Sequence, residues 1–470
     1  MLSAGASGWL IGFGLVVSVY FLLWSAAQMA MGPIAAMFLR RHQRRHTRRS
    51  LATIERLASP PLVSIVVPAF NEELTIIDSM HALLALDYQE REIVLVNDGS
   101  TDGTLAVLSE AFQLVPAPVA FAQPIKTAAV LGIYRSLNEP RLVVVDKVNG
   151  RCKADAANAG INAASGGLVL IIDGDTVIEP EALSRAVMPF LEDPATVAVG
   201  GSIGIINGCR VKAGRIEGIT LPGSWLARFQ IIEYMRSFML FRLACASINA
   251  VVLVSGAFGL FRRDAVLAVG GYDTTAIGED MDLTVRLQQH FRARRLPVRI
   301  AFDPNPLGWT QVPEDWRSLR GQRHRWRRGL LQVLWRRRRM VGNPRFGVVG
   351  VAVLPYVVVF EGLAPLLEFA GYAVTAAASL LGFLNWAYFQ FMIIGLVFLS
   401  TAITLTAVLL SDLVTRRYMS GRDLGLLVAA ALLESCGYRQ LNSWWGCVAT
   451  ARAFTKPPGW GVIKRRGFTT

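Results

Sequence analysis

The sequence predicts an α/β domain with a central, mostly parallel sheet, joined to transmembrane and interfacial α-helices. From Pro61 onward, short apolar runs alternate with helical stretches, which is typical of a parallel sheet with crossover helices. One of these runs, Leu168 to Ile172, ends in two closely spaced aspartates. The chain has 470 residues, of which 53% are hydrophobic, and its mean hydropathy of +0.41 is high for a soluble protein. We therefore expect membrane-spanning segments beside the α/β domain.

The basic charge of the chain gathers beside its apolar segments. The formal net charge is +14, and the arginines cluster at Arg40 to Arg49, Arg323 to Arg328, Arg336 to Arg339 and Arg416 to Arg417. This pattern indicates positive-inside anchoring and contact with membrane lipids. Nucleic acid is not an expected partner, because no RNA motif, zinc finger or helix-turn-helix accompanies the charge. The five cysteines form no CxxC pair, which favours reduced thiols in a cytosolic compartment.

The first membrane segment runs from Gly8 to Leu39 and is followed at once by the letters RRHQRRHTRR. A cleavable signal peptide carries its positive charge in front of a shorter apolar core. We therefore expect residues 1–39 to form a spanning helix with the N-terminus outside. Residues 40–60 then form a basic linker that holds the following chain in the cytoplasm.

The predicted α/β domain, residues 61–310, begins with the units VSIVVPAFNEE and REIVLVNDGSTDGT. Each apolar strand ends in polar loop residues, Phe70 and Glu72 in the first unit and Asp98 in the second. Parallel sheets bind ligands beyond the carboxyl ends of their strands, so both loops are expected at one edge. Ordinary helix capping and turn formation also explain these letters.

The segment LVLIIDGDTVIEP contains residues that can bind a metal ion. Its apolar part reads as a buried parallel strand, and Asp173 and Asp175 follow at once. Alternate residues of an extended segment project on the same side. Two carboxylates placed in this way suit Mg²⁺ or Mn²⁺ held jointly with a substrate diphosphate. A simple strand-end turn is the alternative, because aspartate and glycine are ordinary turn residues.

Two later segments offer groups that can act on a sugar. The letters GGYDTTAIGEDMDLTVRL end a loop at Glu279 and Asp280 and enter an amphipathic helix, where a carboxylate can act as a general base or merely offset the helix dipole. The basic stretch 311–345 is expected to be interfacial and carries the letters QRHRW. These place Gln322, Arg325 and Trp326 on one helix, where arginine can bind diphosphate and tryptophan can stack on a sugar.

The remaining apolar segments divide into interfacial and spanning helices. Pro222 to Asn249 mixes large apolar residues with arginines, which favours a helix on the membrane surface over a core helix. Residues 346–414 hold two spanning segments, Phe346 to Ala378 and Trp386 to Val414. Glu361 and Glu368 are costly in lipid and should face protein or a polar path.

Residues 415–470 are expected to form an interfacial or re-entrant helix and a basic tail. Leu424 to Phe454 has a short apolar run followed by polar groups, including Glu434 and Arg439, which lipid alone would not accommodate. A segment of this kind returns the tail to the cytoplasm.

The letters PAFNEE, VNDGSTDGT, DGD, GED and QRHRW occur in the order of a membrane-integrated family 2 glycosyltransferase. The chain resembles the processive branch of that family, which includes cellulose, chitin, hyaluronan and poly-N-acetylglucosamine synthases. The resemblance covers Pro61 to Gly329 and implies a GT-A-type nucleotide-sugar-binding fold. Gly278 stands where these synthases usually have threonine, and Asn97 where many relatives have aspartate.

The resemblance also implies roles for single residues. Nucleotide-sugar binding would involve Phe70, Glu72, Asp98, Lys153, Asp173, Gln322 and Arg325. Asp280 would be the catalytic base with Glu279 beside it, Trp326 and Gly256 would bind the acceptor, and Asp175 with Asp173 would hold Mg²⁺ or Mn²⁺. The tail residues Trp460, Gly461, Lys464 and Arg465 loosely resemble a gating loop.

The function implied is inverting, processive transfer from a UDP-sugar, either N-acetylglucosamine or glucose, to a growing polysaccharide. The protein would act at the inner membrane, extrude its product and work with export or accessory subunits. One alternative is the transfer of a single sugar to a lipid acceptor. Another is a catalytically dead, membrane-anchored protein that binds a nucleotide or a lipid.

Overall fold

The computed structural model describes residues 4–46, 59–117, 122–174, 176–212, 214–415, 418 and 420–453. Several predictions fall outside these residues. They concern the metal ligand Asp175, most of the basic linker, the pair Arg416 and Arg417, and the tail with Trp460, Gly461, Lys464 and Arg465.

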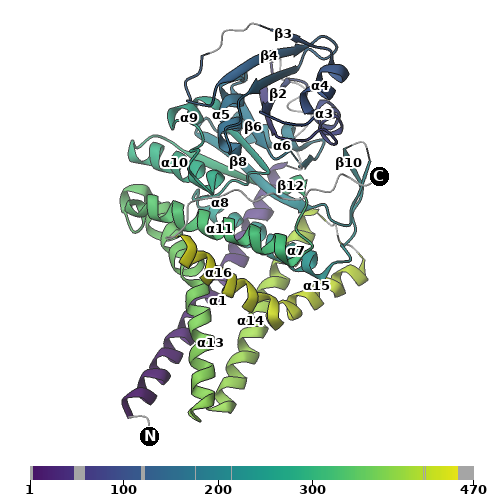
Figure 1. Cartoon of the computed structure of the whole chain (residues 1–470). Coiled ribbons are helices and arrows are strands. Elements are labelled where there is room, and N and C mark those ends of the chain that lie inside the picture. Colours follow the sequence, from purple (N-terminus) through teal and green to yellow (C-terminus); the bar gives the residue numbers. More distant parts are fainter. Residues whose placement is uncertain are drawn as a thin grey trace.

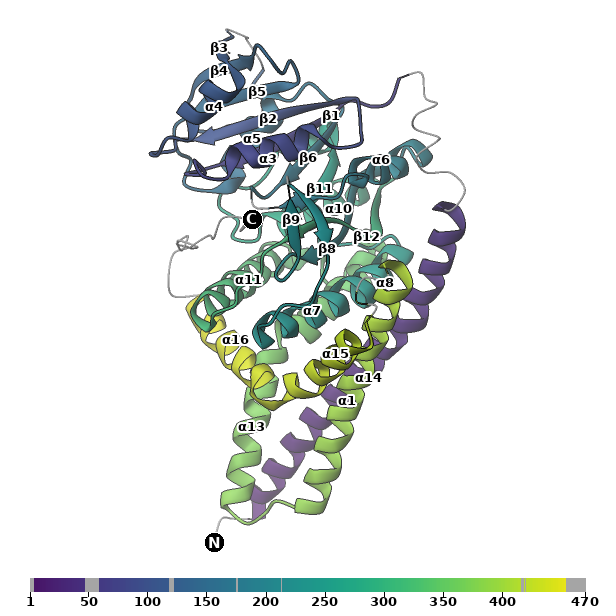
Figure 2. The same cartoon turned by 90° about the vertical axis from the view of Figure 1, so that its right-hand side faces the viewer.

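The molecule has three layers along its long axis (Figures 1 and 2). A sheet domain lies at one end and a stalk of long helices at the other, with shorter helices between them. The stalk consists of α1 (Ala4–His46), α13 (Ala364–Leu380) and α14 (Trp386–Thr415). Within the described residues, three helical segments are long and apolar enough to cross a membrane, namely Gly12–Gln43, Val349–Leu380 and Trp386–Thr415. The three apolar segments expected from the sequence are therefore helices of spanning length.

The described residues form one ten-stranded sheet in the order β3-β4-β5-β2-β1-β6-β11-β8-β12-β7. The strands are β1 (Val63–Ala69), β2 (Arg91–Asp98), β3 (Leu114–Pro116), β4 (Val130–Ser136), β5 (Leu142–Lys147), β6 (Leu168–Ile172), β7 (Val177–Ile178), β8 (Thr196–Ile205), β11 (Phe258–Arg262) and β12 (Arg299–Thr310). Strands β5, β2, β1 and β6 are parallel neighbours, and β11 runs antiparallel between β6 and β8. The small hairpin of β9 (Arg210–Lys212) and β10 (Arg215–Gly218) is separate.

Helices cover both faces of the sheet, because the strands at its centre are apolar on both sides. One face packs against α3 (Ile76–Leu84), α4 (Thr104–Phe112) and α6 (Ala182–Glu192), the other against α5 (Lys153–Ala163), α9 (Arg263–Ala268) and α10 (Glu279–Ala293). Along β1, Val63, Ile65 and Val67 point to the first face and Val66 to the second, as the alternation of a strand requires. This confirms the predicted α/β fold class.

The middle layer consists of α7 (Trp225–Arg236), α8 (Leu243–Ser247), α11 (Trp316–Arg336), α15 (Gly421–Leu433) and α16 (Arg439–Ala453). Helices α15 and α16 form a V beneath α7 and α11 (Figure 2). A break at Cys436 and Gly437, where Gly437 has φ of 100°, separates the two arms. Each arm is shorter than the about 20 residues that a spanning helix needs.

The arginines of the middle layer correct one expectation from the sequence. Arg236 of α7 is not directed at lipid headgroups, since it forms an ion pair with Glu434, whose side chain is 5% exposed. Arg327 of α11 donates hydrogen bonds to the carbonyls of Glu361 and Gly362. These carbonyls lie in the π-helical segment Val357–Gly362, where the regular backbone hydrogen bonding of the membrane span is interrupted. Much of this positive charge therefore joins helices inside the protein.

Candidate active site

The carboxyl ends of four parallel strands define one edge of the sheet. The register pairs Ala69 of β1 with Asn97 of β2, and Asp98 of β2 with Lys147 of β5. Strand β6 ends at Ile172, so Asp173 enters the same edge. Phe70 follows β1 directly, and its side chain is 48% exposed. The structure thus brings together the loops in which the sequence placed the nucleotide-binding residues.

Asp98 is held below the surface of this edge. The Lys147 ammonium contacts the carboxylates of both Asp98 and Asp155, the latter at 2.6 Å, and the Lys147 side chain has no exposure. The backbone N–H of Gly150 donates to Asp98 Oδ1 at 3.0 Å. Asp98 therefore fixes the loop after β5. Glu72 accepts a hydrogen bond from the Thr75 hydroxyl and braces its own turn.

Lys153, Asp173, Gly256 and Asp280 meet at the centre of the candidate site. The Lys153 ammonium lies 2.5 Å from Asp173 Oδ1 and donates to the Gly256 carbonyl at 2.9 Å. The Gly256 N–H in turn donates to Asp280 Oδ2 at 3.3 Å. Lys153 begins α5 and Asp280 lies in the first turn of α10, so two helix starts converge on the end of β6.

The carboxylates at the start of α10 have raised pKa values. Burial, followed by the neighbouring charge of Asp280, raises the pKa of Glu279 to about 7. Burial also raises the pKa of Asp280, although N–H groups of Met281 and Gly256 stabilise its ionised form. For Lys153, burial opposes the charged form, but the carboxylates of Asp173 and Glu279 raise its pKa. Such raised carboxyl pKa values in a partly buried site suit proton transfer near neutral pH.

Helix α11 carries Gln322, Arg325 and Trp326 toward the site. Oε1 of Gln322 is buried and has no hydrogen-bond partner among the described residues, so it is free to accept from a ligand. Burial lowers the pKa of Arg325, and the nearby Glu279 opposes this shift. The Trp326 side chain is 46% exposed, with its ring centroid 6.4 Å from that of Tyr234. An exposed tryptophan face is available for stacking.

The backbones of helix α11 and of the loop before Asp280 approach each other at two glycines, Gly329 and Gly278. A Cβ atom on Gly329 would lie 2.9 Å from the nitrogen and 3.0 Å from the Cα of Gly278. The contact is between backbones, so no flexible side chain can move aside. Gly278, which the sequence analysis noted as a departure from the usual threonine, is thus one half of a helix-to-loop contact.

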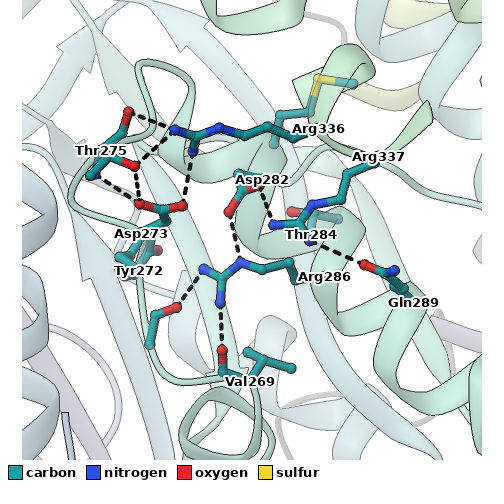
Figure 3. A network of polar contacts seen from close by, with 12 residues as sticks. Val269, Tyr272, Asp273, Thr275, Asp282, Thr284, Arg286, Gln289, Arg336 and Arg337 are labelled. Atoms are coloured by element: carbon teal, nitrogen blue, oxygen red, sulfur yellow. Dashed lines mark hydrogen bonds and ion pairs between the residues drawn. The ribbon is translucent and has the colours of Figure 1, made fainter. Parts of the chain in front are cut away.

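The end of α11 and the residue after it contact the loop before α10 and the first turns of α10 through polar side chains (Figure 3). Arg336 bonds to Asp273 at 2.9 Å and to the Thr275 hydroxyl at 2.8 Å. Arg337 and Arg286 donate to opposite oxygens of Asp282, whose side chain is fully buried. These contacts were not expected from the sequence, in which the run Arg336 to Arg339 indicated anchoring at the membrane surface.

Two signals in the sequence could have indicated this network. Asp273 and Asp282 flank the GED letters and need cationic partners if they are buried. Gln332 and Arg336 are four residues apart, so they share one face of α11. Gln332 contacts the loop as well: its Oε1 accepts from the Ile277 N–H at 2.8 Å and its Nε2 donates to the Thr275 carbonyl at 3.0 Å.

The site offers few protein ligands for a divalent metal, which would need substrate phosphates as further ligands. Asp173 offers a carboxylate that is 38% exposed at the sheet edge, and Asp175 lies outside the described residues. The described part of the chain contains no cluster of three His, Cys, Asp or Glu side chains that could hold a metal ion alone. Mg²⁺ and Mn²⁺ commonly bind through one or two carboxylates together with substrate phosphates, and the donor set is suited to that arrangement.

The chain is similar to proteins of known type over its sheet domain and part of its helices. Residues 64–268 match glycosyl transferase family 2, and residues 168–410 match glycosyl transferase family group 2. The poly-beta-1,6-N-acetyl-D-glucosamine synthase of Staphylococcus aureus strain COL is 31% identical over 274 residues, and that of Staphylococcus epidermidis is 30% identical. The matched part is 58% of this chain and 56% of each synthase, so the chain spans about half the length of these curated relatives.

One solved structure shares the arrangement over most of its length. The mannosyltransferase PcManGT from Pyrobaculum calidifontis, in complex with GDP-Man and Mn²⁺, covers 89% of this chain and 99% of its own, with a TM-score of 0.53. At 20% sequence identity this likeness concerns the fold. The arrangement of the sheet domain and of the helices below it is therefore also found in a solved structure.

Proposed function

Because the chain belongs to the family 2 glycosyltransferases, we propose that it transfers a sugar from a UDP-sugar to a growing polysaccharide. The match to glycosyl transferase family group 2 covers residues 168–410, which is more than half of the chain. The synthases that it resembles support N-acetylglucosamine as the donor sugar, with glucose as the alternative. The observation that carries the proposal is the pair of hydrogen bonds that connects Lys153 to Gly256 and Gly256 to Asp280. They link the edge of the sheet, where we propose that the UDP-sugar binds, to the carboxylate of Asp280.

The residues have separate roles in the proposed reaction. Phe70, Glu72 and Asp98 form the uridine side. Lys153 and Arg325 bind the diphosphate, with Gln322 accepting a hydrogen bond from the bound sugar nucleotide. Asp173 and Asp175 would hold Mg²⁺ or Mn²⁺, which would supply charge neutralisation for the departing diphosphate. Trp326 stacks on the terminal acceptor sugar, and Gly256 leaves space for it beside Asp280.

Asp280 acts as the general base in this proposal. It takes the proton from the attacking acceptor hydroxyl, the oxygen forms the new bond to the anomeric carbon, and UDP leaves from the opposite side. A single displacement inverts the anomeric centre and gives a β-linked product from an α-linked donor. Burial raises the pKa of Asp280, and burial together with the charge of Asp280 raises the pKa of the neighbouring Glu279 to about 7.

The proposed topology places this chemistry in the cytoplasm. Residues 1–39 cross the inner membrane from an outside N-terminus, residues 61–310 form the catalytic domain, and residues 311–345 are interfacial. The two spans within 346–414 leave the remainder, 415–470, on the cytoplasmic side as interfacial helices and tail. The product is extruded beside the spans, with export or accessory subunits as partners.

The test is UDP release from the purified full-length protein in detergent, with UDP-N-acetylglucosamine and UDP-glucose compared. We expect release with one donor, loss of release on metal chelation, and a product of many sugars. Asp280→Asn is the control for background hydrolysis. No release with either donor would support a dead, ligand-binding protein, and a product with one added sugar on lipid would support single transfer. Either result overturns the proposed polymerase.

A further inference from the structure

Helix α11 contacts the proposed base loop along its whole C-terminal half. The loop of residues 269–278 leads into Glu279 and Asp280, and it has little regular structure of its own. Three side chains of α11 and its end bind this loop or the start of α10: Gln332, Arg336 and Arg337. We call these three residues the α11 clamp.

Each member of the clamp holds a different point. Gln332 fixes the backbone at Thr275 and Ile277, which lie four and two residues before Glu279. Arg336 fixes the side chains at the loop tip, and Arg337 reaches Asp282, one turn into α10 (Figure 3). Together they hold the segment on both sides of the base.

The other end of α11 is anchored independently of the loop. Arg323 forms an ion pair with Glu233 of α7, and Arg327 binds two carbonyls of the Val349–Leu380 membrane span and the Thr450 hydroxyl of α16 at 3.0 Å. A helix of this length, about 30 Å at 1.5 Å per residue, is a stiff connection. The clamp therefore holds the loop against the membrane-anchored part of the protein.

We infer that Gln332, Arg336 and Arg337 are positioning residues, which set the place of Asp280 relative to the diphosphate-binding and sugar-binding residues on the same helix. This inference rests on the proposed function. Gln322, Arg325 and Trp326 lie on the first half of α11, Gln332 and Arg336 lie on the second, and Arg337 follows the helix directly. One rigid element and its C-cap therefore carry both the substrate contacts and the support of the base. The fully buried Asp282, bound by Arg337 and Arg286, fixes the direction of α10.

The competing explanation is that Arg336 to Arg339 only attract anionic lipid, and the chain contains a matched control for it. Arg339 belongs to the same basic run, is exposed, and its guanidinium forms no hydrogen bond or ion pair with the described residues. Arg337→Ala and Arg339→Ala remove the same charge from neighbouring positions. Lipid attraction predicts equal effects, whereas the clamp predicts that only Arg337→Ala matters.

The experiment measures kcat and the KM for the UDP-sugar in Arg337→Ala, Arg337→Lys and Arg339→Ala, with thermal unfolding of each. We expect Arg337→Ala to lower kcat by about 10- to 100-fold at nearly unchanged donor KM, because a misplacement of about 1 Å costs this much. Arg337→Lys should recover part of kcat, and Arg339→Ala should equal the wild type. Equal kcat in the two alanine variants would overturn the inference.

A second measurement does not depend on activity. The Ile277 N–H donates to Gln332, so Gln332→Ala should accelerate hydrogen exchange at residues 275–278 while α5 exchanges as in the wild type. Unchanged exchange there overturns the clamp. If the wild-type protein transfers no sugar but Gln332→Ala still exchanges faster at residues 275–278, the proposed function is refuted and the clamp stays in place.

Discussion

The contact between Gly278 and Gly329 predicts an unusual response to a single methyl group. In Gly329→Ala the new Cβ would lie 2.9 Å from the Gly278 nitrogen and 3.0 Å from its Cα, whereas ordinary contacts begin near 3.4 Å. The helix and the loop must therefore separate by about half an ångström. Gly278 directly precedes Glu279 and Asp280, so the displacement reaches the proposed base.

Stability and activity should respond to different extents. Overpacking costs about 1–3 kcal/mol, but alanine in a helix interior stabilises by about 1 kcal/mol relative to glycine, so the net loss of stability is about 0–2 kcal/mol. For catalysis, a shift of half an ångström corresponds to about a 10-fold loss of kcat if a shift of 1 Å costs about 100-fold. The donor KM should change less than kcat, because Phe70, Glu72 and Asp98, proposed to bind the uridine, lie at the ends of β1 and β2 and not on α11.

Gly321→Ala is the matched control on the same helix. A Cβ there would meet only the Arg325 guanidinium, at 4.0 Å, so the helix gains stability without pressing on the loop. We expect a raised Tm for Gly321→Ala with wild-type UDP release, and a reduced kcat for Gly329→Ala. If both variants kept the wild-type kcat in the initial-rate assay, the reasoning from the glycine contact would be refuted.

Three further predictions follow from the site and the helix layer. The base Asp280 must be ionised, and burial raises its pKa as it raises that of Glu279, so kcat should fall on acidification at a pH well above the ordinary aspartate pKa; an acid limb that begins only near that ordinary value would contradict the assignment. Trp326→Ala should raise the acceptor KM about 5-fold, from about 1 kcal/mol of lost stacking, with donor binding and Tm unchanged; a large loss of Tm would instead indicate a packing role. Glu434→Ala leaves the Arg236 cation without its partner and should destabilise the protein by about 3–5 kcal/mol in detergent melts, whereas Arg236→Met combined with Glu434→Leu should recover most of this loss.

The elements that the sequence predicted best are those with a simple periodic pattern. The strand Leu168–Ile172 has the predicted bounds, because five consecutive apolar residues followed by Asp-Gly admit few other structures. The three candidate spanning helices were equally clear, since long apolar segments with few charged residues are typical of membrane spans. The end of β6 then placed Asp173 correctly at the sheet edge.

The arginines after Trp326 were assigned less well, because charge patterning does not distinguish a lipid headgroup from a buried aspartate. Arg336 and Arg337 bind acids that lie 55 to 63 residues earlier in the chain. Pairing over this sequence separation depends on the angle at which α10 and α11 cross, and that angle cannot be predicted from a local sequence pattern. The partners Asp273 and Asp282 were visible in the sequence, but their burial was not.

The position of the clamp late in the chain has a consequence for biosynthesis. The base loop, residues 269–278, is made well before Arg337, and the carbonyls that anchor α11 belong to Glu361 and Gly362, which are made later still. The sheet domain can fold as its strands emerge, since domains generally fold in order during synthesis. Its base loop, however, gains its support only when the following membrane span has been made and inserted. We therefore expect nascent chains that end before the span to hold a folded sheet domain with an unsupported base, so that sugar transfer begins only after the enzyme has reached the membrane.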